Sequence, residues 1–314
     1  MHIPVMIDEV MKYLQPKDGE VYVDCTFGRG GYTKRMLGSA NVDVFSIDCD
    51  PDAKDFAKIF QKDLSNKEKF HFLKGNFCDI ESLLNDRNIK KVDAIVLDLG
   101  ISSMQVDDGS RGFSFSKEAR LDMRMSKKGY SAYEFINESD ERTIADVIYK
   151  YGEEQKSFRI AKKIIEARKE GPITTTTELA EIVRSVFPKK YTKIDSATKT
   201  FQAIRIYVND ELQSLELALD ASEKLLNEGG RLIVVSFHSL EDSIVKQFLK
   251  VRCSKGASNS RYLPSEVEEE FVPRFSYLSR KSVKPSRDEV LSNIRSRSAR
   301  LRAAVRVNQG VHNA

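Results

Sequence analysis

The feature that most constrains this chain is a glycine-rich turn between a short apolar run and a predicted helix. A strand is predicted over residues 21–24, and the turn Asp24-Cys25-Thr26-Phe27-Gly28-Arg29-Gly30-Gly31 follows it, with a helix starting near Thr33. Glycine lets the backbone approach a ligand at positions where a Cβ atom would clash. A strand, such a turn and a helix N-terminus together predict a site for a nucleotide-type cofactor.

A carboxylate stands at a useful distance from this turn. The apolar run over residues 42–47 ends in Asp48, about 20 residues after the turn, and a carboxylate at the tip of the second strand can accept hydrogen bonds from both hydroxyls of a ribose. The pair predicts a cofactor that contains adenosine, without deciding which one.

The first hundred residues alternate between strand and helix patterns. The predicted strands cover residues 21–24, 42–47, 70–73 and 92–97, and the predicted helices cover 33–37, 51–63 and 80–85. Short strands that alternate with helices indicate an α/β fold with a doubly wound, mainly parallel sheet.

The alternation then stops, and residues 106–207 show helical patterns without a convincing strand. Thr175 and Glu178 have the spacing of a capping box at the start of one of these helices. The α/β pattern resumes with a helix over 209–227 that Gly229-Gly230 would end, a strand over 231–237, and a helix capped by Ser239 with Asp242. We therefore expect a discontinuous α/β domain over 1–105 and 208–314, and a helical insertion over 106–207.

Composition excludes some classes of protein and leaves one question open. No apolar run of the 314 residues approaches the ~20 needed to span a bilayer, and the N-terminus has no signal-peptide pattern. The four cysteines lack metal-ligand spacing, so a cytoplasmic protein without a bound metal is predicted. Residues 271–314 carry ten Lys/Arg against two Asp/Glu, although the net charge of the whole chain is only +4. This basic tail, whose alternation is helix-like, indicates either a solvated surface or contact with a polyanion such as RNA.

Acidic residues at the predicted strand ends separate the cofactor classes. Position 33 is threonine, where a dinucleotide fingerprint requires glycine, and no phosphate-binding loop of the Gly-Lys-Ser/Thr type is present. The carboxyl ends of parallel strands face the ligand, and four of them are followed by aspartates: Asp24, Asp48, Asp79 and Asp98. Carboxylates suit a cofactor that carries a sulfonium and an ammonium group, and they would repel a pyrophosphate. The turn Gly28-Arg29-Gly30-Gly31 resembles the first loop of S-adenosylmethionine-dependent methyltransferases.

Several of these side chains also have a structural interpretation. Asp24 and Asp98 are compatible with turn residues, Asp79 with a helix cap, and Phe77 with either a core residue or a surface for a flat adenine. His238, at the end of the fifth predicted strand, is compatible with a structural hydrogen bond as well as with an active-site role. Gln202, Arg205 and Asn209 would share a helix face that can line the cleft.

Long motifs recur in the order of one known family. They are the glycine turn, Asp98-Leu99-Gly100-Ile101-Ser102-Ser103-Met104-Gln105, Arg111-Gly112-Phe113-Ser114-Phe115, Leu121-Asp122-Met123-Arg124-Met125, Tyr151-Gly152-Glu153-Glu154, Thr200-Phe201-Gln202-Ala203-Ile204-Arg205-Ile206, Ser236-Phe237-His238-Ser239-Leu240-Glu241-Asp242 and the basic stretch that begins at Arg295. In these motifs the chain resembles the bacterial 16S ribosomal RNA cytosine-N4 methyltransferase H family along nearly its whole length.

The resemblance implies a class I, Rossmann-like methyltransferase fold with a helical insertion that recognises the substrate. It implies S-adenosylmethionine as cofactor, the N4 atom of a cytidine in the decoding region of 16S rRNA as methyl acceptor, and the small ribosomal subunit as partner. The implied cofactor-binding residues are Gly30, Gly31, Tyr32, Asp48, Phe77, Asp98 and Gln105. The chain departs from the family at Tyr32, where histidine is frequent, and over residues 195–199.

An exocyclic amine is a poor nucleophile, because its lone pair is delocalised into the ring. The protein must therefore hold the amine close to the methyl group and accept an N–H as charge develops. The candidates for this role are Asp98, Ser102, Ser103 and His238.

Two other functions stay open: a nicotinamide-dependent oxidoreductase, and a non-enzymatic RNA-binding or ribosome-assembly factor that has kept a cofactor pocket. The oligomeric state stays open too, with a homodimer among the alternatives.

Overall fold

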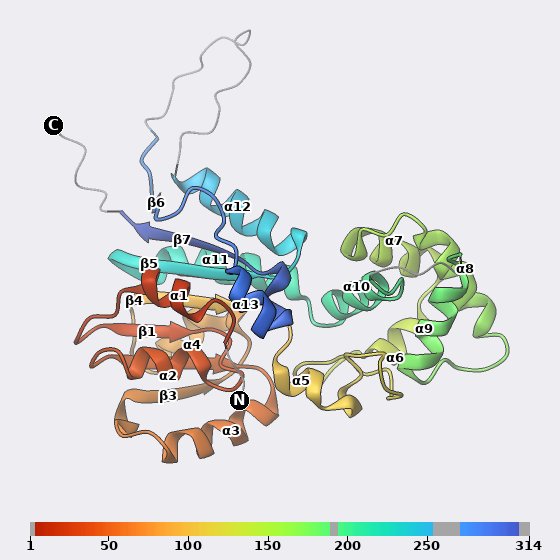
Figure 1. Cartoon of the computed structure of the whole chain (residues 1–314), viewed down its shortest axis with the longest axis horizontal. Coiled ribbons are helices and arrows are strands. Elements are labelled where there is room, and N and C mark those ends of the chain that lie inside the picture. Colours follow the sequence, from red (N-terminus) through yellow and green to blue (C-terminus); the bar gives the residue numbers. More distant parts are fainter. Residues whose placement is uncertain (1–3, 189–193, 254–270, 308–314) are drawn as a thin grey trace, which may run out of the picture. The chain divides into compact units, whose positions relative to one another are not determined.

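The computed structural model describes residues 4–188, 194–253 and 271–307, and its elements are labelled in Figure 1. The chain divides into two compact units. The first combines Met1–Gly100 with Leu212–Ala314, and the second is Ile101–Glu211. The two units are described separately below.

The first unit is built on a seven-stranded sheet with the strand order β3-β2-β1-β4-β5-β7-β6. The strands are β1 (Val21–Asp24), β2 (Asp43–Asp48), β3 (Phe70–Lys74), β4 (Val92–Asp98), β5 (Leu226–Ser236), β6 (Phe275–Tyr277) and β7 (Arg300–Arg306). Strands β1 to β5 pair in parallel, whereas β7 runs antiparallel to both β5 and β6. The predicted doubly wound, mainly parallel sheet is confirmed.

Helices cover both faces of this sheet. They are α1 (Ile7–Leu14), α2 (Gly31–Leu37), α3 (Pro51–Lys62), α4 (Ile80–Asn85), α11 (Glu211–Leu225), α12 (Ser239–Cys253) and α13 (Arg287–Ser292), with 3-10 turns η1 (Lys67–Lys69), η2 (Phe77–Asp79) and η4 (Ile294–Ser298). Val23 of β1 belongs to the core that the sheet shares with α4, α11 and α12. The next residue, Asp24, faces the other side and bonds to Thr33 of α2, as the alternation of side chains along a strand requires.

The structure corrects two sequence-based expectations in the C-terminal part of this sheet. Strand β5 begins at Leu226, so Gly229 and Gly230 lie within the strand and do not end the preceding helix. Gly229 has a φ of +78°, and the register between β4 and β5 shifts at this place. Part of the basic stretch whose alternation looked helix-like, Arg300–Arg306, is strand β7, which lies beside β5 (Figure 1). The part before it, Ile294–Ser298, is the 3-10 turn η4.

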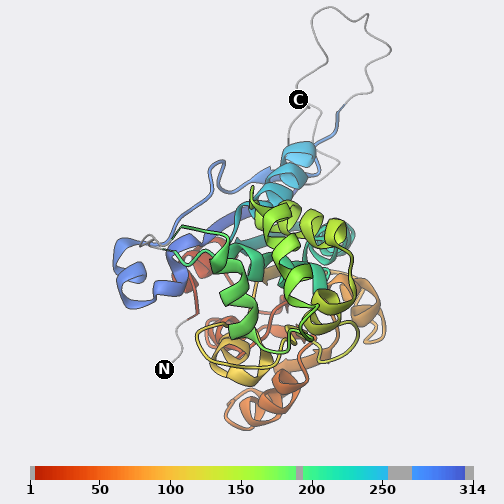
Figure 2. The same cartoon turned by 90° about the vertical axis from the view of Figure 1, so that its right-hand side faces the viewer.

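The second unit is helical. Its elements are α5 (Ser103–Asp107), η3 (Gly109–Arg111), α6 (Ala132–Glu138), α7 (Glu141–Gly152), α8 (Ser157–Ala167), α9 (Thr176–Ser185) and α10 (Thr198–Val208). Figure 2 shows the green helices of this unit from a second direction. They enclose a core of their own that includes Phe135, Ile148 and Leu179. The predicted capping box is confirmed, since the Glu178 N–H donates to Thr175 Oγ1 and the Glu178 carboxylate accepts from the Thr175 N–H.

Within the described ranges, no helix is both long enough and apolar enough to cross a membrane.

Candidate active site

The glycine turn after β1 is held in a backbone conformation that favours glycine. Gly28 has a φ of +51° and Gly30 a φ of +68°, values that side-chain-bearing residues rarely adopt. A Cβ on Gly30 would come within 2.8 Å of the rings of Phe27 and Phe60, and one on Gly31 would overlap Pro4. The close approach that requires glycine is therefore to side chains of the protein itself, in addition to any ligand.

Asp48, at the end of β2, is tied directly to this turn. Its Oδ2 accepts the Gly28 N–H at 2.8 Å and its Oδ1 accepts the Asp50 N–H at 2.8 Å. Burial raises the pKa of Asp48 to about 6, against the opposing effect of these two hydrogen bonds. Each carboxylate oxygen keeps a second lone pair, so the turn aims a carboxylate that can accept two further hydrogen bonds.

Asp24 has a structural role. It is fully buried, its Oδ2 accepts from Thr33 Oγ1 at 2.7 Å, and its Oδ1 accepts the Thr26 N–H at 3.1 Å. These bonds join the end of β1 to helix α2 and confirm the interpretation of Asp24 as a turn residue.

Asp98, at the end of β4, is the most unusual carboxylate of the sheet. Its backbone N–H donates to Thr26 Oγ1 at 2.8 Å, but its buried Oδ1 has no hydrogen-bond partner among the described residues. Burial raises the pKa of Asp98 well above its usual range, and the charges of Asp24, Glu241 and Glu289 raise it further. A buried acceptor without a partner is costly, and a cation placed here would satisfy it.

Two other predicted cofactor contacts have distinct surroundings. Phe77 begins η2, three residues after the end of β3, and is half-buried at the edge of the core. Tyr32 is buried, and its hydroxyl donates to the Val5 carbonyl, so its side chain packs the N-terminal segment. Asp79, expected as a helix cap, precedes α4 without making a side-chain capping bond.

His238 lies just beyond the end of β5, beside a carboxylate that the sequence analysis did not single out. Glu241 Oε2 accepts the Phe237 N–H at 2.7 Å and the His238 N–H at 3.3 Å, and the Glu241 N–H donates to His238 Nδ1 at 3.4 Å. The predicted use of Asp242 at this helix start is wrong, because Asp242 pairs with Arg302 of β7. The missed signal was a glutamate three residues after the histidine, at the beginning of a helix.

The remaining candidates belong to the second unit. Ser102 and Gln105 form a capping box at the start of α5: the Gln105 N–H donates to Ser102 Oγ at 3.3 Å, and the Ser102 N–H donates to Gln105 Oε1 at 2.9 Å. Ser103, between them, is buried. The structure thus brings Asp48, Asp98 and His238 to one edge of the sheet. Ser102, Ser103 and Gln105 lie at the start of the helical unit.

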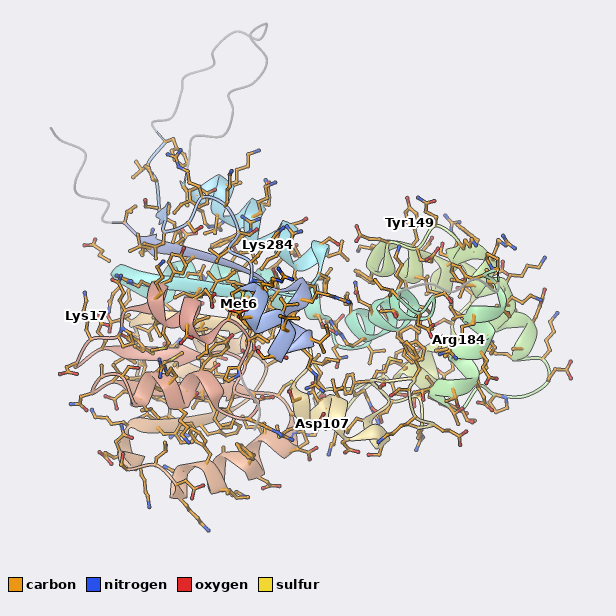
Figure 3. All side chains as sticks on the ribbon, viewed as in Figure 1. Met6, Lys17, Asp107, Tyr149, Arg184 and Lys284 are labelled. Carbon is orange, nitrogen blue, oxygen red and sulfur yellow. The ribbon has the colours of Figure 1, made fainter. Side chains whose placement is uncertain are left out.

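The helix face expected to line the cleft is occupied by contacts inside the second unit. Arg205 makes a two-pronged ion pair with Glu211, and the Asn209 side chain bonds to the backbone of Met123 and Met125. At the departure over residues 195–199, Asp195 pairs with Arg184, which Figure 3 labels.

Comparison with known proteins gives a consistent result along the chain. Residues 1–307 match the model of the MraW methylase family. The chain is 47% identical over 313 residues to the ribosomal RNA small subunit methyltransferase H of Orientia tsutsugamushi (strain Ikeda), covering 98% of this chain and 99% of that protein. It is 49% identical over 306 residues to the protein of the same name from Rickettsia prowazekii (strain Madrid E), covering 98% of each. A solved rRNA methylase from Streptococcus thermophilus has a TM-score of 0.43 at 10% identity, covering 96% of this chain and 94% of that one.

The glycine turn, the carboxylates at the strand ends and the full-length match agree with one another, and the chain belongs to the MraW methylase family.

Proposed function

We propose that this protein transfers a methyl group from S-adenosylmethionine to the exocyclic N4 of a cytidine in the decoding region of 16S rRNA. The protein is a methyltransferase, since it belongs to a methylase family over almost its whole length, and S-adenosylmethionine is its cofactor. This membership argues against the nicotinamide-dependent alternative. The names of the relatives support small-subunit rRNA as the substrate.

The observation that carries the proposal is the buried Oδ1 of Asp98, which has no hydrogen-bond partner in the described part of the chain. S-adenosylmethionine has an ammonium group and a sulfonium, and either charge would lower the raised pKa of this carboxyl. In the proposed site Asp98 accepts from the ammonium group, Asp48 accepts from the ribose hydroxyls, and Phe77 lies against the adenine. Gly31 and Tyr32 contribute backbone N–H groups at the start of α2, Gly30 lies next to them in the turn, and Gln105 completes the set.

When bound, the cofactor supplies a methyl group on a sulfonium: the N4–C bond forms as the C–S bond breaks, and a neutral thioether leaves. The protein must orient the amine in line with that bond and accept the proton that N4 loses. We assign this acceptor role to the second carboxylate oxygen of Asp98, with Ser102 and Ser103 as further hydrogen-bond partners of the amine. His238 is the fourth residue of the proposed catalytic group.

The second unit and the basic residues near the C-terminus are the proposed RNA contacts. The target base must leave its stack to reach the sheet edge, so other residues must bind the phosphates on either side of it. Arg295, Arg297 and Arg300 are the proposed phosphate ligands, and each phosphate contact removed should flatten the salt dependence of RNA binding by about one unit. The small ribosomal subunit is the proposed partner, the cytoplasm the proposed location, and a homodimer the proposed assembly.

The decisive experiment is mass spectrometry of 16S rRNA nucleosides from cells with and without the protein. N4-methylated cytidine is expected only in cells that have the protein, and Asp98→Ala should abolish this modified nucleoside. Asp48→Ala should mainly weaken cofactor binding, which calorimetry measures. Identical nucleosides in both cell types would contradict the proposal and favour the non-enzymatic assembly factor.

A further inference from the structure

Two buried polar atoms without a hydrogen-bond partner lie at the ends of neighbouring strands in the first unit. Among the residues that the structure describes, Asp98 Oδ1 and His238 Nε2 are both buried and neither has a hydrogen-bond partner. Asp98 ends β4 opposite Val235 of β5, and His238 follows three residues later. Glu241 relates the two, because its Oε1 lies 3.1 Å from His238 Nε2 and its charge also acts on Asp98. Buried polar atoms are normally paired, so both atoms point to a ligand.

The surroundings of His238 determine which ring nitrogen carries the proton. Nδ1 accepts the Glu241 N–H at 3.4 Å, and a neutral imidazole with an accepting Nδ1 has its hydrogen on Nε2. The negative Oε1 of Glu241, 3.1 Å away but not aligned for a hydrogen bond, favours that hydrogen as well. The His238 side chain is 10% exposed, so this N–H donor is held in a protein environment.

Glu241 is itself held in place. It is 2% exposed, and its Oε2 accepts the backbone N–H groups of Phe237 and His238. The carboxylate therefore cannot swing away from the imidazole without losing two hydrogen bonds. It fixes both the orientation of His238 and the position of the ring hydrogen.

We infer that His238 donates a hydrogen bond from Nε2 to the acceptor edge of the target cytosine, its ring N3 and carbonyl O2, and that Glu241 is the positioning residue for this donor. The inference rests on the proposed function and gives His238 a donor role in place of an acceptor role. Cytosine presents a donor at N4 beside an acceptor at N3. Asp98 at the end of β4 can accept from N4, and His238 beyond β5 can donate to N3, so the two residues match the order of donor and acceptor on cytosine. Uracil would instead place its N3–H against the Nε2–H of His238.

The tautomer can be measured without any activity. In protein labelled with ¹⁵N-histidine, long-range ¹H–¹⁵N spectra distinguish a ring with hydrogen on Nε2 from one with hydrogen on Nδ1, and His238→Gln identifies the signal. Hydrogen on Nε2 is expected. Glu241→Gln should keep one acceptor oxygen for the backbone and remove the charge, which shifts the population away from that tautomer. Hydrogen on Nδ1 in the unaltered protein would overturn the inference.

The base contact is tested with an atomic change in the substrate. Small subunits are reassembled on 16S rRNA that carries either cytidine or 3-deazacytidine, which has C–H in place of N3, at the target position. Loss of a buried hydrogen bond should lower kcat/KM of the unaltered protein on the analogue by roughly 10- to 100-fold. For His238→Ala the ratio of kcat/KM on the cytidine RNA to kcat/KM on the 3-deazacytidine RNA should be much smaller, because this variant has no side-chain donor for N3. His238→Gln, which keeps an N–H donor, should recover part of the ratio.

The control is the affinity of each variant for S-adenosylmethionine by calorimetry, which shows that the first unit is folded. Equal ratios in the unaltered protein and in His238→Ala would overturn the inference alone, since the intrinsic reactivity of the analogue is common to both. No methylation of either RNA by the unaltered protein would instead contradict the proposed function, and the inference with it.

Discussion

At the scale of single residues, desolvation sets the chemistry of the strand ends. Asp48 and Asp98 are both carboxyls whose pKa is raised by burial, yet their surroundings differ. Asp48 accepts two backbone N–H groups, whereas the buried oxygen of Asp98 accepts none from the described residues. Asp98 therefore has more to gain from a bound cation.

This difference predicts a proton release. In the free protein the raised pKa favours the protonated form of the Asp98 carboxyl, and a nearby ammonium group lowers that pKa, so cofactor binding should favour release of a proton. At pH 7.5 Asp48, with a pKa of about 6, is already ionised and does not contribute. Calorimetry in two buffers of different ionisation enthalpy measures the release, which Asp98→Asn should remove. Equal enthalpies in both buffers for the unaltered protein would contradict the assignment.

Gly30 provides a second residue-scale prediction, with a matched control. Gly30 and Gly19 both have a positive φ, +68° and +83°, but only a Cβ on Gly30 would press against aromatic rings, at 2.8 Å. Gly19→Ala should lower the free energy of unfolding by about 1 kcal/mol through backbone strain alone. Gly30→Ala should cost roughly 1 to 3 kcal/mol more, because the core is overpacked. Urea denaturation measures both, and equal losses would show that the rings move aside freely.

At the scale of elements, strand β7 depends on an ion pair with helix α12. Arg302 is 8% exposed, and its Nε and Nη2 donate to the two oxygens of Asp242 at 2.7 and 3.1 Å. Arg300 lies 3.6 Å from the same carboxylate. This pair lets a strand that carries three arginines lie between two other strands.

Removing the arginine should therefore destabilise the first unit. Arg302→Met leaves Asp242 nearly buried beside a more distant cation, and breaking such a pair costs about 3 kcal/mol or more. Arg35→Ala is the control, since Arg35 pairs with Asp8 at 3.6 Å on the exposed surface and should change little. Chemical denaturation measures the free energy of unfolding of both variants. A similar decrease in both would show that the buried pair stabilises the protein no more than the exposed pair does.

At the scale of the whole molecule, each compact unit has its own apolar core. The second unit buries Phe135, Ile144, Leu179 and Ile204 among its own helices, as a part of a chain that folds alone must do. The proposed division of labour, with cofactor chemistry in one unit and RNA recognition in the other, requires this independence.

A fragment of residues 101–211 should therefore fold by itself. Its circular dichroism should be helical, and its thermal unfolding should be one cooperative transition. A matched change, Phe135→Ala, should lower the midpoint strongly because it empties a fully buried site. A fragment that melts gradually from low temperature would show that the first unit is needed to hold these helices.

Local patterns carried the prediction of much of the fold. The four strands β1 to β4 lie within one residue of their predicted ends, because short apolar runs between turn signals are local properties of the chain. Helix α4 and the capping box of α9 were also predicted correctly, since a cap involves residues only three apart. The spacing also singled out Asp48 as a carboxylate near the glycine turn, and its Oδ2 accepts the Gly28 N–H.

The amino-acid sequence by itself thus determined the strand–turn–helix unit, the parallel half of the sheet and the acidic residues at its edge, because these follow from periodicity and short-range spacing. Only the tertiary structure decided that Arg302 lies in a strand, since its partner Asp242 is 60 residues away. It also decided which buried carboxylate oxygen lacks a hydrogen-bond partner within the described ranges, and that Glu241 orients His238. Desolvation and hydrogen-bond pairing depend on everything packed around an atom, and that is a property of the folded chain.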